Sequence, residues 1–261
     1  MNGLLEERVE QGAVAVLTLH RPEVMNSINT ELGFALRDAL DRLSEDASVR
    51  VIVFTGAGER AFCTGGDLKE RNQMTNEQWL KQHRLFQDVF RKIRQSDKPV
   101  ITAVNGFALG GGCELALSGD FVYASKSAKF GLPEVTRGII PGVGGTQTIG
   151  RFLPRGLALE LLLTGKPLSA EAAFEYGMVN KLLEPGELLK ETLQAAQTIA
   201  QNSPLAVRMA KKAFRLGIDL PLEEGIELAL ECYNRTIVHP DREEGIRAYN
   251  EKRPPVFLDI V

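Results

Sequence analysis

The sequence predicts an α/β fold, and three observations point to that class. Short apolar runs with the length and the β-branched composition of strands occur at Val14–Leu19, Val51–Thr55 and Val100–Val104. Segments of helical length with an apolar stripe separate these runs. Glycine-rich turns follow two of the runs and lead into helical segments. Such alternation predicts layers of strands and helices, and a doubly wound sheet is one arrangement that the pattern allows.

The first helical segments carry recognisable start signals. Thr30 is a suitable N-cap for a helix that extends to about Ser44, with leucines and alanines along one face. Thr75 and Gln78 have the spacing of a capping box, in which each side chain accepts a backbone N–H of the other residue. We therefore expect a long helix after Thr75, and the apolar stripe of that helix is core material.

Strands and helices alternate closely around residue 100. The helical segment after Val100–Val104 contains Glu114 and is expected to end at Gly119, because glycine suits a helix C-cap. Phe121–Ala124 is the next expected strand. Helices dominate beyond Gly145, and they are expected at residues 169–176, 203–216, 221–236 and 241–251.

Glycine-rich turns carry the chemical signal of this sequence. A strand, a glycine-rich turn and a helix start leave unpaired backbone N–H groups and a partial positive charge facing whatever occupies the turn. This order occurs around Gly65 and Gly66 and again from Asn105 to Glu114. From these residues alone, the glycines are equally consistent with ordinary turns, and Glu114 with a favourable partner of the helix dipole.

Four motifs in a fixed order favour a functional site over ordinary turns. They are Ala-Phe-Cys-Thr-Gly-Gly-Asp at residues 61–67, Asn-Gly-Phe-Ala-Leu-Gly-Gly-Gly-Cys-Glu at 105–114, Gly-Leu-Pro-Glu at 131–134 and Ile-Pro-Gly-Val-Gly-Gly-Thr-Gln at 140–147. In order and spacing they resemble the crotonase (enoyl-CoA hydratase/isomerase) superfamily, and the resemblance covers nearly the whole chain. It implies a crotonase-like (ClpP/crotonase) spiral of ββα turns with a C-terminal α-helical oligomerisation region.

The same resemblance implies how the chain is divided. Residues 1–195 would form the spiral core with the active site, and residues 196–261 the helical region. In crotonase-like proteins such a helical tail packs against neighbouring subunits. We therefore expect a homo-oligomer, either a trimer or a hexamer built as a dimer of trimers.

Catalytic roles also follow from the resemblance. Adding water to an α,β-unsaturated thioester builds negative charge on the thioester oxygen, and two backbone N–H groups aimed at that oxygen stabilise the enolate. The matched motifs imply an oxyanion hole at Gly66 and Gly111. They make Glu114 the base that accepts a proton from water and Glu134 the donor of a proton to C2. Because paired carboxyls titrate together, the pair as a whole is expected to carry out both proton transfers. The division into a base and a donor is a secondary assignment.

The resemblance implies that coenzyme A binds mainly to the backbone of the Ala61–Asp67 loop, with its phosphates near cationic side chains. Lys69 matches a position that often meets the phosphates, and Lys252 or Arg253 would contribute from the same or another subunit. Glu23 departs from the family pattern, because related enzymes often carry a lysine at that position. The residues expected to bind coenzyme A are Ala61, Cys63, Gly65, Asp67, Leu68, Lys69 and Lys252.

The predicted activity is that of an enoyl-CoA hydratase, a lyase that converts a 2-enoyl-CoA into a 3-hydroxyacyl-CoA in fatty acid or branched-chain acyl-CoA breakdown. Two alternatives within the family stay open. Residues 67–71 and 233–255 resemble the methylglutaconyl-CoA hydratase branch of leucine degradation, and a Δ3,Δ2-enoyl-CoA isomerase needs the same proton shuttle without water. An RNA-binding relative is the non-enzymatic alternative, but the helix at residues 30–46 is net acidic and a poor partner for phosphate.

Composition excludes several other classes. A net charge of −3 disfavours a general nucleic-acid or membrane-surface role, and no apolar run approaches the length of a membrane span. The first residues are acidic and lack the apolar core of a signal peptide, so the cytoplasm is the expected location. His83 is expected on the polar face of a helix, and neither histidines nor cysteines show metal-ligand spacing. We expect no metal, and no cofactor beyond the coenzyme A of an acyl-CoA substrate.

Overall fold

The computed structural model describes residues 3–258, and its centre is a six-stranded sheet with the strand order β1-β2-β3-β5-β7-β10. β1 pairs with β2 in antiparallel fashion, and every other neighbouring pair of this sheet is parallel. The strands of this sheet are β1 (Leu5–Glu10), β2 (Val14–Leu19), β3 (Val51–Gly56), β5 (Val100–Val104), β7 (Phe121–Ser125) and β10 (Lys181–Leu183).

A second, smaller sheet has the order β4-β6-β8-β9. Its strands are β4 (Ala61–Cys63), β6 (Phe107–Leu109), β8 (Lys129–Gly131) and β9 (Leu168–Ser169). The chain alternates between the two sheets, because β3, β5 and β7 enter the large sheet and the next strand in each case enters the small one. Helical segments follow each such pair. This is the spiral of ββα turns expected from the sequence, and it excludes a doubly wound single sheet.

Helices surround both sheets. The α-helices are α1 (Thr30–Glu45), α2 (Leu68–Arg71), α3 (Asn76–Gln95), α4 (Gly111–Ala116), α5 (Gly145–Phe152), α6 (Arg155–Thr164), α7 (Ala170–Glu175), α8 (Leu188–Ala200), α9 (Pro204–Gly217), α10 (Leu222–Ile237) and α11 (Pro240–Glu251). Short 3-10 helices are η1 (Pro22–Val24), η2 (Pro133–Arg137) and η3 (Pro185–Glu187). No helix within residues 3–258 is both long and apolar enough to cross a membrane.

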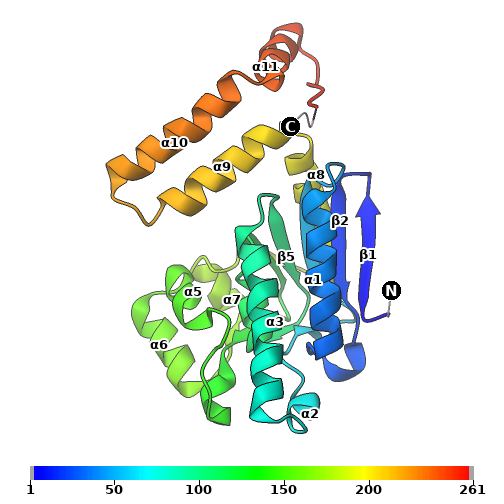
Figure 1. The fold of residues 1–261 in the computed structure, drawn as a ribbon, viewed down its shortest axis with the longest axis vertical. Coiled ribbons are helices and arrows are strands. Elements are labelled where there is room, and N and C mark those ends of the chain that lie inside the picture. Colours follow the sequence, from blue (N-terminus) through cyan, green and yellow to red (C-terminus); the bar gives the residue numbers. More distant parts are fainter. Residues whose placement is uncertain (1–2, 259–261) are drawn as a thin grey trace.

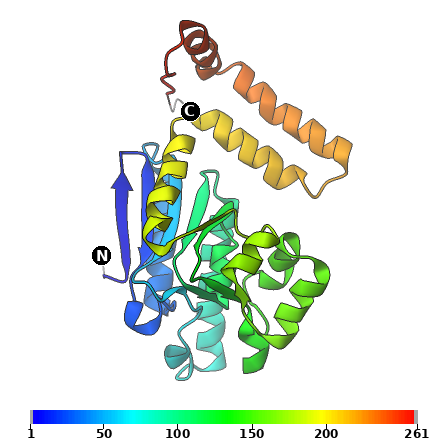
Figure 2. The ribbon, with the colours of Figure 1, turned by 180° about the vertical axis from the view of Figure 1, so that it is seen from behind.

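The two faces of the large sheet enter separate apolar clusters. Leu17 and Phe54 belong to the main core, together with the apolar faces of α1 and α3. Val16 and Val53, one position earlier on each strand, belong to a second cluster with α8. The two-residue period of a strand produces this division. Figures 1 and 2 show α1 and α3 on one side of the sheet and α8 on the other.

The last helices stand apart from the sheets. α9 packs along α10, and the pair extends away from the rest of the molecule in both views (Figures 1 and 2). Residue 195, the predicted division point, lies within α8, and the two-part division stays a prediction. Large apolar side chains are exposed on α9 and α10 and in the turns beside them; they include Phe214, Ile218, Leu222, Leu230, Tyr233 and Val238.

The helix start signals predicted from the sequence are mostly confirmed by the structure. The predicted capping box is present, since the Gln78 N–H donates to Thr75 Oγ1 at 3.2 Å and the Thr75 N–H donates to Gln78 Oε1 at 2.8 Å. The N-cap expected at Thr30 is wrong by one residue. Asn29 fills that position, and its Oδ1 accepts the Leu32 N–H at 2.9 Å. The Thr30 hydroxyl instead accepts a hydrogen bond from a side chain of α3.

The helix end expected at Gly119 is also wrong, because α4 already ends at Ala116. The Ser118 hydroxyl donates to the Glu114 carbonyl at 2.7 Å and satisfies a carbonyl that a longer helix would have used. Gly119 instead allows its backbone to lie close to β5, since a Cβ at this position would be 3.1 Å from the carbonyl oxygen of Val100.

Candidate active site

The small sheet brings three of the four motifs to one place. β4, β6 and β8 are parallel neighbours, so their carboxyl ends lie at the same edge of the sheet. Gly65 and Gly66 follow β4, Gly110 and Gly111 follow β6, and Glu134 follows β8. Residues that are far apart in the sequence therefore meet around one space.

Gly66 and Gly111 present their backbone N–H groups side by side. A Cβ on Gly65 would lie 2.9 Å from the nitrogen of Gly111, and a Cβ on Gly111 would lie 3.8 Å from the nitrogen of Gly66. Gly65 has a φ of +86°, a backbone conformation that side chains disfavour, so glycine is needed at this turn. Among residues 3–258, neither Gly66 nor Gly111 donates its N–H to another protein group. Both donors are available to an oxygen in the cavity.

Glu114 is held in place by the fourth motif. Its side chain is buried on α4, and its Oε1 accepts the Val143 N–H at 2.9 Å and the Gly145 N–H at 2.7 Å. A Cβ on Gly145 would lie 2.9 Å from this Oε1, so only glycine permits the contact. Burial raises the pKa of Glu114, and the N–H donors of Gly145, Val143 and Gly142 partly offset that rise. Oε2 is the oxygen left to meet a water molecule.

Glu134 lies in a different electrostatic setting on η2. The residue is only 9% exposed, and its Oε2 is buried with no hydrogen bond from the described residues. Burial is the main cause that raises the pKa of Glu134 to about 7, and the charge of Glu114 adds to it. Arg137 and Arg71 act in the opposite direction. Near neutral pH, a large fraction of this carboxyl therefore carries a proton.

Two cavities meet at these residues. Gly66, Gly111 and Glu134 border both of them. The first, of about 510 Å³, has several charged residues on its walls. The second, of about 620 Å³, also contains Glu114 and is mostly apolar, with walls that include Ile28, Trp79, Leu80, Phe86, Phe90, Ile139, Ile140 and Val143. The arrangement suits a substrate with a polar part, a reacting centre at the junction and an apolar part.

Four of the residues expected to bind coenzyme A border the first cavity, namely Gly65, Asp67, Leu68 and Lys69. Ala61 and Cys63 do not, because they are buried within β4. Lys252 follows α11. Figure 1 shows α11 at the opposite end of the molecule from α2, whose Leu68 and Lys69 border the first cavity. A contribution from Lys252 would therefore have to come from another copy of the chain. Glu23 borders the first cavity and adds negative charge there.

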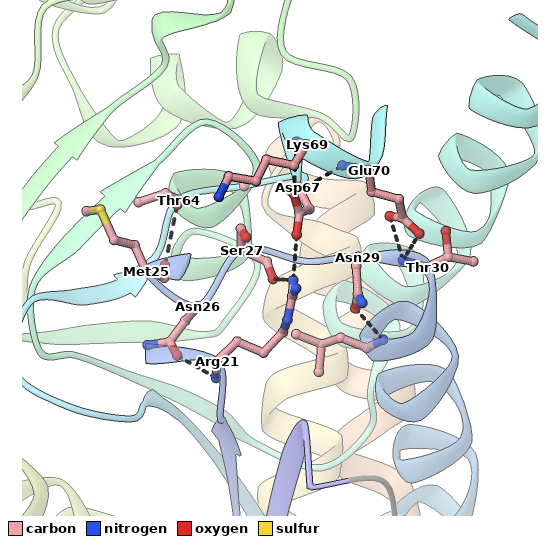
Figure 3. A network of polar contacts seen from close by, with 12 residues as sticks. Arg21, Met25, Asn26, Ser27, Asn29, Thr30, Thr64, Asp67, Lys69 and Glu70 are labelled. Carbon is pink, nitrogen blue, oxygen red and sulfur yellow. Dashed lines mark hydrogen bonds and ion pairs between the residues drawn. The ribbon is translucent and has the colours of Figure 1, made fainter. Parts of the chain in front are cut away.

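Asp67 fixes the turn that carries the glycines, as Figure 3 shows. Its Oδ1 accepts the Lys69 N–H at 3.0 Å and the Glu70 N–H at 3.3 Å, which caps α2. Its Oδ2 lies 2.9 Å from Nη1 of Arg21, which also donates to the Ser27 carbonyl at 2.7 Å. Burial opposes ionisation, but these hydrogen bonds outweigh it and lower the pKa of Asp67. Arg21 is occupied by this ion pair.

Sequence reasoning missed four residues that border the cavities. Arg60 and Arg137 line the first cavity, His83 lines the second, and Arg71 lines both. The expectation that His83 is an ordinary polar-face residue is wrong, because its face of α3 turns toward the site. No periodic pattern marks these positions. For Arg71, the available signals were its spacing, one helical turn after Asp67, and its place in the segment 67–71 that resembles the methylglutaconyl-CoA hydratase branch.

The ββα spiral, the two carboxyls and the pair of open N–H groups define a crotonase-type enzyme. Comparison with known proteins agrees. A family model described as enoyl-CoA hydratase/isomerase matches residues 9–259. The chain belongs to this family.

Individual relatives are similar over nearly their whole lengths. The short-chain-enoyl-CoA hydratase of Clostridium acetobutylicum is 37% identical, with 97% of this chain and 96% of the relative covered. The (E)-benzylidenesuccinyl-CoA hydratase of Thauera aromatica is 41% identical, with 94% and 95% covered. The crystal structure of an enoyl-CoA hydratase from Bacillus anthracis has a TM-score of 0.96 and 40% identity, with 98% of this chain and 100% of that chain covered.

Proposed function

We propose that the protein is a hydro-lyase that adds water across the C2=C3 bond of a 2-enoyl-CoA and gives a 3-hydroxyacyl-CoA. One observation carries this proposal. Glu114 and Glu134 border the same cavity as the N–H groups of Gly66 and Gly111, which is the set of groups that the reaction needs. Relatives named as hydratases support the same reaction. The proposed mechanism requires no metal and no cofactor besides the coenzyme A of the substrate.

The geometry supports a sequence of proton transfers. Water gives a proton to the Glu114 carboxylate while its oxygen forms a bond to C3, and the electrons of the double bond move toward the thioester oxygen. Gly66 and Gly111 donate their N–H groups to the oxygen of the resulting enolate. The Glu134 carboxyl then gives its proton to C2 as the carbonyl reforms. Proton return from Glu114 to Glu134, directly or through water, restores the starting state.

The environments of the two glutamates support this division of roles. Burial raises the pKa of Glu114, but the backbone N–H groups at Oε1 favour its ionised form and partly offset that rise, which suits a base. The pKa of Glu134 is raised to about 7, which favours a carboxyl that donates a proton at neutral pH.

For coenzyme A, we propose that the phosphates lie in the first cavity near Lys69, Arg60 and Arg137. These cations offset the negative charge of Glu23 at the cavity wall. The acyl chain would then enter the second cavity. Lys252 of another copy of the chain stays a proposed further contact.

A panel of thioesters tests the reaction. Crotonyl-CoA and 3-methylglutaconyl-CoA should lose their enoyl absorbance on hydration, and a 3-enoyl-CoA should gain it if the enzyme is an isomerase. Hydration of a 2-enoyl-CoA, with product identified by mass, is the expected result. Shift of the double bond without incorporation of water from H2¹⁸O would contradict it.

The exposed apolar side chains of α9 and α10 support assembly into a homo-oligomer. We propose a trimer or a dimer of trimers, in the cytoplasm. Light scattering after gel filtration should give three or six times the mass of the 28.7 kDa chain, and a monomer would contradict this part of the proposal.

A further inference from the structure

Arg94 lies against the glycine-rich turn that holds Glu114. It is in the last turn of α3, and its Nη1 donates to the Val143 carbonyl at 2.8 Å. A Cβ on Gly144 would lie 3.7 Å from Nη1 and 3.8 Å from Cζ of Arg94, so the guanidinium packs on the turn. Arg94 is half-buried and is not among the described residues that border the two cavities. It therefore lies behind the site and does not face a substrate in these cavities.

The turn at residues 142–145 needs support from outside. Gly142, Gly144 and Gly145 leave its backbone with much conformational freedom, and Gly144 has a φ of +120°, which side chains disfavour. Holding such a segment in one shape costs conformational entropy that contacts have to offset. Across residues 3–258, Arg94 is the one group that donates a hydrogen bond to the Val143 carbonyl.

This carbonyl lies between the two N–H groups that bind Glu114. The Val143 N–H precedes it along the backbone and the Gly145 N–H follows it, and both donate to Oε1 of Glu114, at 2.9 Å and 2.7 Å. Rotation of the peptide group that contains the carbonyl would turn these two donors away from a common acceptor. By holding the carbonyl, Arg94 keeps both N–H groups directed at Oε1.

The charge of Arg94 acts in the same direction. Burial is the main cause that raises the pKa of Glu114; the N–H donors of the turn oppose the rise, and so does the charge of Arg94. Burial lowers the pKa of Arg94, and the charge of Glu114 opposes that change. The other titratable side chains near Glu114 are Arg71, His83, Glu134 and the adjacent Cys113. Of all these groups, Arg94 is the one that also donates a hydrogen bond to the turn.

We propose that Arg94 is a positioning residue for the base of the reaction. Through the Val143 carbonyl it holds the 142–145 turn, and the turn holds Oε1 of Glu114 so that Oε2 meets the attacking water. This inference rests on the proposed hydration at the same site. Because Arg94 does not border the cavities, its loss should slow the chemical step and leave substrate binding nearly unchanged.

Arg94→Met in the full-length protein tests the proposal with crotonyl-CoA as the substrate. Methionine keeps an unbranched side chain but removes the hydrogen-bond donor and the charge. We expect kcat to fall about tenfold, the effect of losing one charge-assisted hydrogen bond, while KM changes by less than about twofold.

The pH profile of kcat/KM separates this role from a merely structural one. Its acidic limb reports protonation of Glu114 and should move to higher pH in Arg94→Met, because loss of a nearby cation favours the protonated carboxyl. Its alkaline limb reports Glu134 and should stay in place, because the cations that act on Glu134 are Arg137 and Arg71.

Three further variants complete the test. Arg91→Met is the matched control on the same helix, since Arg91 is exposed and pairs with Asp88 at 2.6 Å; kcat and both limbs should be unchanged. Arg94→Lys keeps the charge and should bring the acidic limb back toward that of the wild type. Arg94→Gln keeps a polar side chain at this half-buried position. If Arg94→Met does not fold, Arg94→Gln replaces it and should show the same movement of the acidic limb.

An unchanged kcat in Arg94→Met would overturn the proposal. The same factor of loss at every pH would also overturn it, because a general weakening of the fold would then explain the effect. A rise in KM that accounts for the whole loss would mean that Arg94 supports substrate binding, and would equally overturn it.

If the wild type hydrates no thioester at all, the proposed function fails instead, and amide hydrogen exchange still decides the inference. Measured by mass spectrometry, the segment that contains residues 142–145 should take up deuterium faster in Arg94→Met than in the wild type or Arg91→Met. The reason is that the N–H groups of Val143 and Gly145 would no longer be held on Oε1 of Glu114. Equal exchange in the three proteins would overturn the proposal.

Discussion

Replacement of Glu134 by glutamine should remove activity and change how stability depends on pH. Glutamine keeps the shape of the side chain but neither donates a proton to C2 nor ionises. General acid–base catalysis contributes about 10²–10⁴ in rate, so kcat should fall at least about a hundredfold. The free energy of unfolding should respond as well, because ionising a buried carboxyl is costly.

The size of the stability effect follows from the pKa of Glu134. Its value rises from 4.5 to about 7 on folding, so the folded protein binds more protons than the unfolded chain between these pH values. Stability contributed by the protonated carboxyl is therefore complete below pH 4.5 and is lost as the pH rises through about 7. The loss corresponds to about 3 kcal/mol at pH 8. Glu134→Gln avoids it, because its amide does not titrate.

Urea unfolding of the wild type and Glu134→Gln at several pH values measures this difference. The variant should gain about 3 kcal/mol relative to the wild type between pH 4.5 and pH 8, while crotonyl-CoA hydration drops. Glu175→Gln, an exposed residue on α7, is the control and should leave turnover unchanged. Near-wild-type turnover of Glu134→Gln would refute its role as proton donor. A stability difference that does not vary with pH would refute the raised pKa.

Four other changes test the remaining parts of the site. Glu114→Gln should lower kcat about a hundredfold or more in the same assay, and a rate near that of the wild type would contradict the base role. Gly111→Pro removes an N–H donor, so a variant that circular dichroism shows to be folded should have no measurable hydration; retained activity would exclude this donor. Gly145→Ala crowds Oε1 of Glu114, and we expect lower kcat and a loss of about 1–3 kcal/mol in urea unfolding. Asp67→Ala leaves Arg21 without its ion-pair partner and should cost about 3 kcal/mol; an unchanged unfolding midpoint would show that the pair is dispensable.

Periodicity made four strands of the large sheet, β2, β3, β5 and β7, and its long helices predictable. The run Val51–Thr55 was identified because four of its five residues are β-branched. The helix after Thr75 was identified because its two cap residues have a fixed spacing. These signals are local, and the chain carries them whatever its tertiary structure is. They also explain why the errors in helix bounds lie at ends such as Gly119, where neighbouring groups decide the last turn.

The strands of the small sheet gave no such signal. β4, β6 and β8 each contain three residues, which is too short for an alternating pattern to emerge. Pairing between distant segments creates these strands, and that pairing sets the carboxyl ends of all three at one edge. The motifs identified the candidate glycines and glutamates, but only the parallel pairing of the three strands explains why these residues lie close together.

The sequence by itself determined the family, because the four motifs depend only on residue identity and spacing along the chain. The ββα turns and the candidate roles of the two glutamates followed from that resemblance, since the apolar pattern also allowed a doubly wound sheet. Tertiary structure alone decided that the turn at Val143–Gly145 holds the Glu114 carboxylate and that Arg71 lies between the two cavities. The physical reason is that hydrogen bonding, burial and charge depend on distances through space. Such distances between residues far apart in the chain are set only when the sheets pair and the helices pack on them.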